Sequence, residues 1–385
     1  MITLGNERLH ESTYADLIGG RRVGLITNHS GVDHNLRSTA DRLHACDACE
    51  LVALFGPEHG VRGDAADGDR IASGRDPYTG VPVCSLYGDR LQPSTGMLEK
   101  LDVMLFDIQD VGARFYTYLY TMSLSMQACG AHDIPFVVLD RPNPLGGVRV
   151  AGNVLDPAFA SFVGLHPISI CHGLTIGELA VLFNHEYGLG ADLSVVPMRG
   201  WNRSMQWEQT GLPWVAPSPN MPTMDTATVY PGTCLIEGTN LSEGRGTAKP
   251  FEQLGAPYVD GPRLAAELGD LALPGVLFRP LYFQPAFSKY AGDVCRGVQL
   301  HVVDRSVFEP VRTGLEVIAA VRRLWPAEFG WRTTSDDIYN FDRLAGTDRI
   351  RRQIDAGVPV ASIQADWADE LARFVRLRQS YLSYP

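Results

Sequence analysis

The sequence predicts an α/β protein with a doubly wound, mainly parallel sheet in its first domain and a second, smaller α/β domain. Two observations indicate this fold class. Apolar runs of four or five residues alternate with helical patterns over the first 140 residues, which is typical of parallel strands buried on both faces. Polar loops containing Gly or Pro follow three of these runs, at the sheet edge where ligands bind in such folds.

The elements of the first domain follow from these patterns in chain order. Strands are predicted over residues 23–27, 51–55, 103–107, 136–140 and 193–197. Helices are predicted over residues 37–48, 95–101, 121–131 and 175–184. Thr175 and Glu178 have the spacing of a capping box at the start of the last helix, so we favour helix capping over catalysis for Glu178.

The second half of the chain is predicted from a change in pattern. Residues 200–232 are rich in Trp, Pro, Asn and Met without a clear period, which predicts a long loop or linker. We therefore expect a domain over residues 1–230 and a smaller one over residues 231–385. In the smaller domain, the patterns predict strands over residues 276–283 and 297–303 and helices over residues 310–324 and 363–382.

Composition argues against several functions. Thirty-three basic residues against 44 acidic ones give a net charge of −11, and no basic stripe offsets it, so nonspecific nucleic-acid binding is not expected. No apolar run reaches the roughly 18 residues that a membrane span needs. The N-terminal residues lack a basic segment followed by an apolar one, so we expect a cytoplasmic protein, or a secreted or periplasmic one if a leader was removed.

Motifs for common cofactors are missing from the sequence. The first predicted strand runs into TNHSG at residues 27–31, which lacks the glycine spacing of a dinucleotide-binding turn. There is no Walker loop, no Gly-x-Ser-x-Gly and no His-Glu-x-x-His. Cys46 and Cys49 end a helix before a strand and have no second pair to complete a zinc site. We therefore expect no cofactor and no bound metal.

Glu58 is the sharpest catalytic candidate. It directly follows a predicted strand, is preceded by Pro57 and lies between two glycines. Partial desolvation at such a position raises the pKa of a glutamate toward the range of a general acid. His59 could orient a partner or contact substrate. The alternative is that Glu58 caps a helix or pairs with Arg62.

Two further strand exits carry polar side chains. Carboxylates, an amide and arginines suit hydroxyl recognition, and a tyrosine suits stacking on a sugar face. The candidates for substrate binding after these strands are Asp107, Gln109, Asp110, Arg114, Tyr116, Asp140, Arg141 and Asn143. The alternative for the first of these loops is an internal ion pair between Asp110 and Arg114.

A fourth polar segment lies beyond the predicted linker. Residues 237–247 contain Glu237, Asn240, Glu243 and Arg245 among glycines that allow close backbone approach. Either glutamate could face Glu58 across a cleft. Residues 218–223, with the binding candidate Asn220, form a similarly rigid and polar turn. The alternative is that residues 237–247 form an ordinary polar loop between domains.

These candidates describe a carboxylate-rich cleft with arginines, amides and aromatic side chains. Glycoside hydrolysis by two carboxylates fits such a cleft best. The rival chemistry is metal-dependent phosphoester hydrolysis, since Asp107 and Asp110 could hold a hard cation.

Six long motifs, in the same order, resemble a bacterial family whose characterised members are exo-β-N-acetylmuramidases, often called NamZ. The motifs are GPEHG at residues 56–60, DIQDVGARFYTY at 107–118, DRPNP at 140–144, HGLTIGE at 172–178, PSPNMP at 217–222 and EGTNLSEGRGT at 237–247. The resemblance implies a Rossmann-like first domain, with the smaller domain closing a cleft. It also implies release of N-acetylmuramic acid from the non-reducing ends of peptidoglycan fragments in cell-wall turnover.

The resemblance supports Glu58 as the acid on the leaving oxygen. For the second carboxylate we consider Glu243 and Glu237, with Glu178 behind them. One of Arg114, Arg141 and Arg245 is expected to pair with the lactyl carboxylate of muramic acid. The non-enzymatic alternative is a muropeptide-binding protein that uses the same cleft without turnover.

Overall fold

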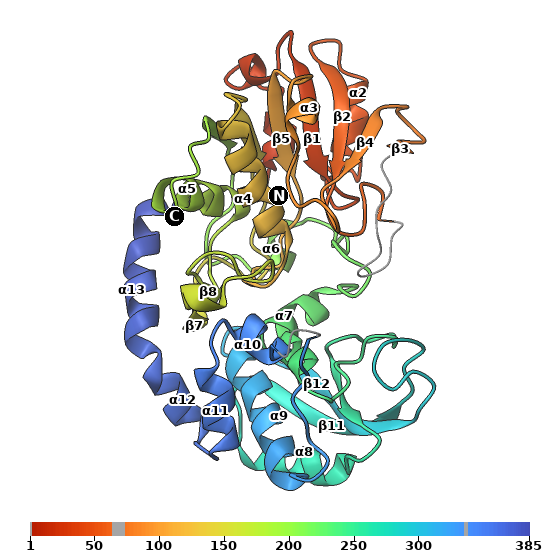
Figure 1. Cartoon of the computed structure of the whole chain (residues 1–385), viewed down its shortest axis with the longest axis vertical. Helices are drawn as coiled ribbons and strands as arrows, with labels where there is room; N and C mark the ends of the chain where they lie inside the picture. The colour runs from red at the N-terminus through yellow and green to blue at the C-terminus, as the bar shows by residue number, and fades with distance from the viewer. Residues whose placement is uncertain (1, 64–73, 335–337) are drawn as a thin grey trace.

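The computed structural model describes residues 2–63, 74–334 and 338–385, and it divides into two halves along its longest axis (Figure 1). The N-terminal half contains a seven-stranded sheet, and the C-terminal half contains a three-stranded sheet. Every helix within the described residues is too short or too polar to cross a lipid bilayer.

The sheet of the N-terminal half has the order β3-β4-β2-β1-β5-β6-β9. Its strands are β1 (Arg22–Thr27), β2 (Glu50–Gly56), β3 (Gly74–Arg75), β4 (Pro82–Ser85), β5 (Val103–Asp107), β6 (Phe136–Leu139) and β9 (Leu193–Val196). All neighbours pair in parallel except β3 with β4. The predicted doubly wound, mainly parallel fold is therefore confirmed. The sequence patterns missed the two short edge strands β3 and β4.

Helices cover both faces of this sheet. Alternate residues of its strands belong to two separate apolar clusters, one on each face. The helices of this half are α1 (Gly5–Arg8), α2 (Thr39–His44), α3 (Thr95–Leu98), α4 (Tyr118–Gly130) and α5 (Ile176–Glu186). The predicted capping box at α5 is confirmed. The Thr175 hydroxyl accepts from the Glu178 amide at 3.2 Å, and the Thr175 amide donates to Glu178 Oε2 at 3.0 Å.

The C-terminal half is built on the antiparallel sheet β10-β12-β11. Its strands are β10 (Gln253–Ala256), β11 (Val276–Phe283) and β12 (Cys295–Val302), and its main helices are α8 (Gly261–Asp270), α9 (Pro310–Leu324), α10 (Asn340–Ala345) and α11 (Arg349–Asp355). The predictions of β11 and α9 match the observed bounds, and the smaller α/β domain is confirmed. The prediction missed β10, α8, α10 and α11.

The segment predicted as a long loop contains two helices, α6 (Trp207–Thr210) and α7 (Met224–Thr233), so that prediction is wrong over both helices and holds for the residues between them. Pro231 and Gly232 lower the helical propensity of α7, but its packing against α9 compensates. A side chain at Gly232 would place its Cβ 1.8 Å from the Pro310 carbonyl oxygen. Glycine is therefore required where these two helices touch.

The C-terminal segment leaves the second half and returns to the first. The predicted single helix is two helices, α12 (Val360–Asp366) and α13 (Ala368–Arg378), with a break at Trp367. Helix α13 runs along one side of the molecule (Figure 1) and contacts β7 (Ala151–Val154), which pairs with β8 (Ser169–Cys171). Beyond α13, the Ser383 amide donates to Glu178 Oε1 at 2.7 Å. The two halves are thus joined at α7 and again at α13.

Candidate functional site

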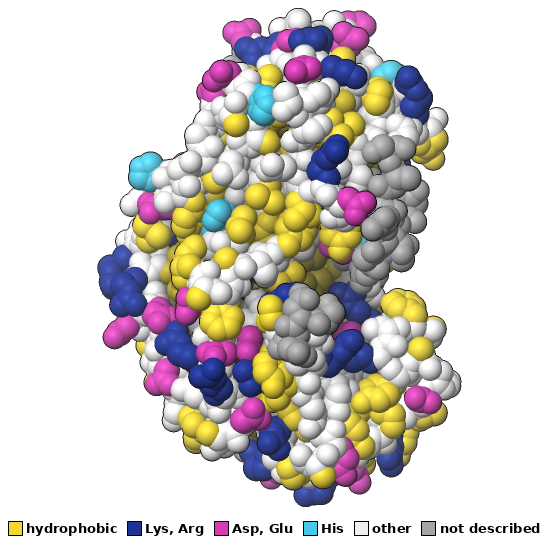
Figure 2. All heavy atoms as spheres, viewed as in Figure 1, with side chains coloured by type: hydrophobic (Ala, Val, Ile, Leu, Met, Phe, Trp, Pro, Cys, Tyr) yellow, Lys and Arg dark blue, Asp and Glu magenta, His cyan; other side chains and the backbone are white. Residues whose placement is uncertain are grey.

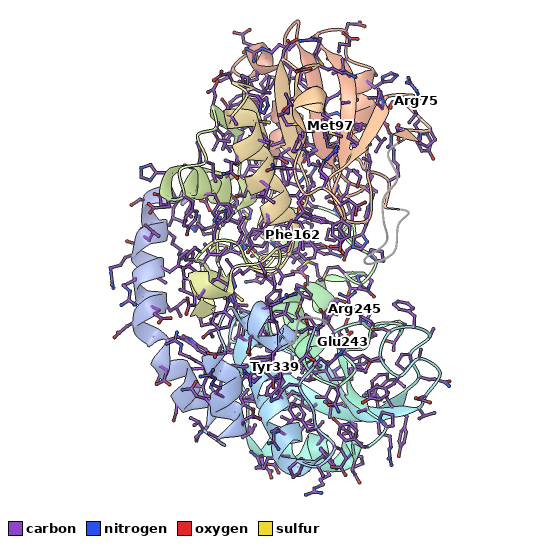
Figure 3. All side chains as sticks on the ribbon, in the orientation of Figure 1. Arg75, Met97, Phe162, Glu243, Arg245 and Tyr339 are labelled. Atoms are coloured by element: carbon purple, nitrogen blue, oxygen red, sulfur yellow. The ribbon has the colours of Figure 1, made fainter. Side chains whose placement is uncertain are left out.

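A cavity of about 510 Å³ lies between the two halves. From the N-terminal half it is lined by Glu58 and His59, which follow β2, and by residues 115–118, which lead into the first residue of α4. The 3₁₀ helix η3 (Cys234–Gly238) and the following loop line it from the other half. Figure 3 shows Phe162 and Arg245, both lining residues, on facing sides of the boundary between the halves. We call this space the large cavity.

Glu58 stands on a tight turn at the end of β2. His59 and Gly60 both have positive φ, at 72° and 77°, so the chain reverses immediately after the glutamate. The Thr117 hydroxyl donates to Glu58 Oε2 at 3.1 Å. The Tyr87 hydroxyl also forms a hydrogen bond with this carboxylate. The half-buried Glu58 side chain is therefore oriented by two hydroxyl donors and still lines the large cavity.

Glu237 lines the large cavity from the opposite half. Its Oε1 accepts from Arg245 Nη2 at 2.8 Å and from Arg245 Nε at 3.1 Å. Burial, followed by the charges of Glu243 and Glu58, raises the pKa of Glu237 to about 8. The Arg245 contact opposes this shift, because a cation favours the ionised carboxylate. We infer a raised pKa, since two carboxylates share the enclosed space with Glu237.

Arg245 is fixed in place between Glu237 and an aromatic ring. Its guanidinium lies 5.1 Å from the centre of the Phe251 ring, a cation–π contact. Burial lowers the pKa of Arg245 to about 10, while the charge of Glu58 acts in the opposite direction. Arg245 is therefore cationic at neutral pH and stands in the field of both glutamates.

A second cavity of about 310 Å³ adjoins the large one and shares Glu237 and Arg245 with it. We call it the basic cavity, because its lining also includes three cationic side chains: Lys289, Arg332 and Arg343. Glu243 lines the basic cavity and not the large one. Its Oε2 lies 2.9 Å from Lys289 Nζ. Glu243 is thus held in an ion pair beside the large cavity.

Aromatic side chains form much of the remaining wall. Tyr116 packs edge to face against Tyr118 and Tyr230, with ring centres 4.9 and 5.9 Å apart. Tyr230 packs in the same way against Phe251. Asn220 adds an amide to the lining. Apolar ring faces with a few directed polar groups are the surroundings that a pyranose ring requires.

The first of the predicted strand-exit groups is closed on itself. Arg141 donates to both oxygens of Asp107, from Nε at 2.5 Å and Nη2 at 2.9 Å. Asn6 and Thr39 also donate to Asp107 Oδ2. The Asp107 and Arg141 side chains are 0% and 4% exposed. The structure therefore places this pair in the interior and not at the large cavity.

Asp140 and Asn143 hold turns together. Asp140 accepts hydrogen bonds from the Arg141 and Gly177 amides and from the hydroxyls of Thr175 and Tyr384. Burial raises the pKa of Asp140 to about 6. Asn143 donates to the Leu174 carbonyl oxygen and accepts from the Leu145 amide. Neither side chain lines the large cavity.

Arg114 is also internal, and the ion pair considered between it and Asp110 is not formed. Its two terminal nitrogens donate to four backbone carbonyl oxygens, those of Asn153, Ile168, Leu344 and Ala345. Burial lowers the pKa of Arg114 to about 10. Because Leu344 and Ala345 belong to α10, this arginine joins the two halves instead of lining the large cavity.

The other candidates outside the lining have local partners. Gln109 donates to the carbonyl oxygens of Asp110 and Pro142. Asp110 accepts from the Gly112 amide at 2.7 Å. Asn240 donates to the Glu328 carbonyl oxygen and accepts from the Tyr258 hydroxyl. All three side chains stabilise loops.

The rival chemistry required Asp107 and Asp110 to hold a hard cation. Both oxygens of Asp107 already accept from Arg141, so a cation there would have to displace an internal guanidinium. Within residues 2–63, 74–334 and 338–385, no group of three or more His, Cys, Asp or Glu side chains is arranged to hold a metal ion. The residues present thus give no geometric support to that alternative.

Several lining residues were not predicted from the sequence. Tyr87 and Phe162 come from loops without any motif that we recognised, and Lys289 and Arg332 lie beyond the last motif. Thr117 and Ser218 fall inside motifs that were identified, at residues 107–118 and 217–222, but were not selected as candidates. In both cases the available signal was a hydroxyl close in sequence to a selected side chain: Thr117 is adjacent to Tyr116, and Ser218 is two residues before Asn220.

Comparisons with known proteins agree along the whole chain. The family described as exo-beta-N-acetylmuramidase NamZ, N-terminal, matches residues 23–225, and its C-terminal counterpart matches residues 228–384. The peptidoglycan beta-N-acetylmuramidase NamZ of Bacillus subtilis (strain 168) is 52% identical over 371 residues, which cover 96% of this chain and 89% of the relative.

Solved structures give the same result. A crystal structure of a DUF1343 family protein from Bacteroides fragilis superposes with a TM-score of 0.92 at 38% identity, covering 100% of this chain and 99% of the other. A second DUF1343 protein of that organism has a TM-score of 0.80 at 31% identity, with the same coverage. From these matches, the chain belongs to the NamZ family of exo-β-N-acetylmuramidases.

Proposed function

We propose that this protein is an exo-acting glycoside hydrolase that releases N-acetylmuramic acid from the non-reducing end of peptidoglycan fragments. In this proposal Glu58 is the general acid and base, and Glu237 is the second carboxylate. The observation that carries the assignment is the large cavity, which brings these two glutamates from different halves into one space lined by aromatic rings. The similarity of this chain to a peptidoglycan beta-N-acetylmuramidase supports peptidoglycan fragments as the substrate class.

The roles of the two glutamates follow from what glycoside hydrolysis requires. One carboxyl must give a proton to the leaving oxygen, while the other carboxylate stabilises charge at the sugar carbon or activates water. Glu58 is oriented by the hydroxyls of Thr117 and Tyr87, so its oxygens are held in a defined direction. Glu237 performs the second role as an ionised carboxylate, and because its pKa is raised to about 8, its ionised fraction increases as pH rises through that value.

Glu243 is the less suitable second carboxylate. It is 2% exposed, sits outside the lining of the large cavity and is paired with Lys289. Glu237 is also ion-paired, with Arg245, but its side chain is 28% exposed and lines the large cavity, so a substrate can reach it. We therefore assign Glu243 to supporting the loop that carries Arg245.

The experiment is hydrolysis of a chromogenic aryl β-N-acetylmuramide and of a disaccharide with N-acetylmuramic acid at its non-reducing end. Glu58→Gln is expected to lower kcat by at least about 100-fold, because general acid and base catalysis contributes that much. Glu99→Gln is the matched control, since Glu99 is an exposed glutamate in the same half. Wild-type activity in Glu58→Gln would remove Glu58 from the mechanism. Substrate binding without turnover by the wild type would favour a binding protein.

A further inference from the structure

Among the residues that the structure describes, the basic cavity is lined by more cationic side chains than carboxylates. Four cationic side chains line it, Arg245, Lys289, Arg332 and Arg343, against the two carboxylates of Glu237 and Glu243. On the face shown in Figure 2, Lys and Arg side chains gather beside the hollow between the two halves. Cationic side chains next to the large cavity are the electrostatic setting for an anionic group on the ligand.

Three of the four cations, Arg245, Lys289 and Arg343, have partners within the protein. Arg245 donates to Glu237 and stacks on Phe251. Lys289 donates to the carbonyl oxygens of Ile236 and Leu241, at 3.1 and 2.7 Å, and it pairs with Glu243. These two side chains fix the wall of the cavity.

Arg332 differs from these two. Its guanidinium makes no hydrogen bond and no ion pair within the described residues, although it lines the basic cavity. It is close enough to act electrostatically on Glu237 and Lys289. Arg332 is exposed and thus presents donors that no described residue uses, beside the cavity wall that holds the second carboxylate.

The backbone at Arg332 is anchored to that same wall. The Arg332 amide donates to the Gly238 carbonyl oxygen at 2.9 Å, next to Glu237, and the Arg332 carbonyl oxygen accepts from the Asn340 amide at 3.0 Å. The neighbouring Trp331 indole donates to the Asp355 carboxylate at 3.0 Å. With its main chain held on both sides, Arg332 can bind an anion without ordering a loop first.

We propose that Arg332 is a specificity-determining residue whose guanidinium binds a carboxylate that the substrate carries outside its sugar ring. This inference rests on the proposed function, because the sugar then occupies the large cavity and projects the carboxylate into the basic cavity. The carboxylate has two chemical sources: the lactyl ether on the sugar itself, or an acidic residue of an attached peptide. A planar guanidinium suits either one, because it donates two parallel hydrogen bonds to a carboxylate.

The test compares three substrates with the wild type, Arg332→Gln and Arg332→Lys. The substrates are an aryl β-N-acetylmuramide, its lactyl methyl ester, and the muramide carrying an acidic dipeptide. If Arg332 binds the lactyl carboxylate, Arg332→Gln raises KM for the aryl β-N-acetylmuramide by about 10- to 100-fold with little change in kcat. The variant does not alter KM for the lactyl methyl ester. Arg332→Lys recovers part of this loss, since lysine keeps the positive charge but cannot donate two parallel hydrogen bonds to one carboxylate.

The other outcomes separate the two sources and the two hypotheses. A loss confined to the dipeptide substrate assigns the carboxylate to the peptide. Equal KM values for wild type and Arg332→Gln on all three substrates overturn the inference, while turnover by the wild type leaves the proposed function intact. If the wild type turns over none of them, calorimetry with N-acetylmuramic acid shows whether binding still depends on Arg332. Arg376→Gln, an exposed arginine on α13, is the matched control.

Discussion

The protein contains two arginine–carboxylate pairs that look alike in sequence and differ in their surroundings. Asp107–Arg141 is sealed in the N-terminal half, with 0% and 4% of the side chains exposed. Glu237–Arg245 lines the large cavity, with 28% and 22% exposed. The first pair has four donors for one carboxylate, whereas the second has one arginine and two neighbouring carboxylates. The two pairs consist of the same kinds of side chain. Only the pair whose carboxylate charge is incompletely compensated, Glu237–Arg245, is suited to catalysis.

The largest expected effect comes from breaking the sealed pair. Asp107→Asn leaves the Arg141 charge buried without compensation, so the free energy of unfolding should fall by about 3–5 kcal/mol. Asp102→Asn is the control, because Asp102 directly precedes the same strand and pairs with Arg22 on the surface. Urea denaturation of both variants measures the difference. Similar losses for the two would show that the interior pair contributes no more than a surface one.

Substitution in the Glu237–Arg245 pair, which lines the large cavity, should affect activity instead of stability. Glu237→Gln is expected to lower kcat by about 100- to 1,000-fold while the fold remains stable. As the second carboxylate, Glu237 acts in its ionised form, and a carboxyl with a pKa of about 8 ionises as pH rises through that value, so wild-type kcat/KM should increase as pH rises through about 8. That increase should disappear in Glu237→Gln, measured with a fluorogenic muramide. An unchanged increase in the variant would mean that another group titrates.

The smallest expected effect concerns Asp140, next to Arg141 of the buried pair, where Tyr384 near the C-terminus contacts the N-terminal half. Tyr384→Phe removes the hydroxyl that donates to Asp140, which still has three other donors. The free energy of unfolding should therefore fall by about 1.5 kcal/mol. Tyr381→Phe is the control, since its hydroxyl contacts Glu186 beside the exposed His185. Thermal or urea unfolding distinguishes them, and a larger loss for Tyr381→Phe would contradict the assignment.

Sequence patterns predicted the sheet because periodicity is a local property. The strand ends also located Glu58 correctly at the edge where the cavity lies. The same criterion, a polar residue at the end of a strand, also selected Asp107, which meets it equally well. That side chain is sealed because Asn6 and Thr39 pack over it, and nothing near residue 107 in the sequence indicates which distant segment covers it.

The cavity wall in the C-terminal half depends on contacts that local patterns do not encode. Lys289 lies between Ser288 and Tyr290, which both have positive φ, an uncommon conformation for residues with side chains. Tertiary contacts hold that backbone, so intrinsic propensities could not predict it. Arg332 reaches the basic cavity only because its backbone pairs with Gly238, 94 positions away in the chain.

Two crossings of the chain, at α7 and at α13, restrict how the large cavity can open. A molecule with one linker can swing its halves apart in any direction. Here any rotation must pivot about an axis that passes near both crossings, and Arg114 adds a buried link from the N-terminal half to α10. Glycan exchange is therefore expected to use hinge rotation about that axis, so that Glu58 and Glu237 separate and return along one defined path in each cycle.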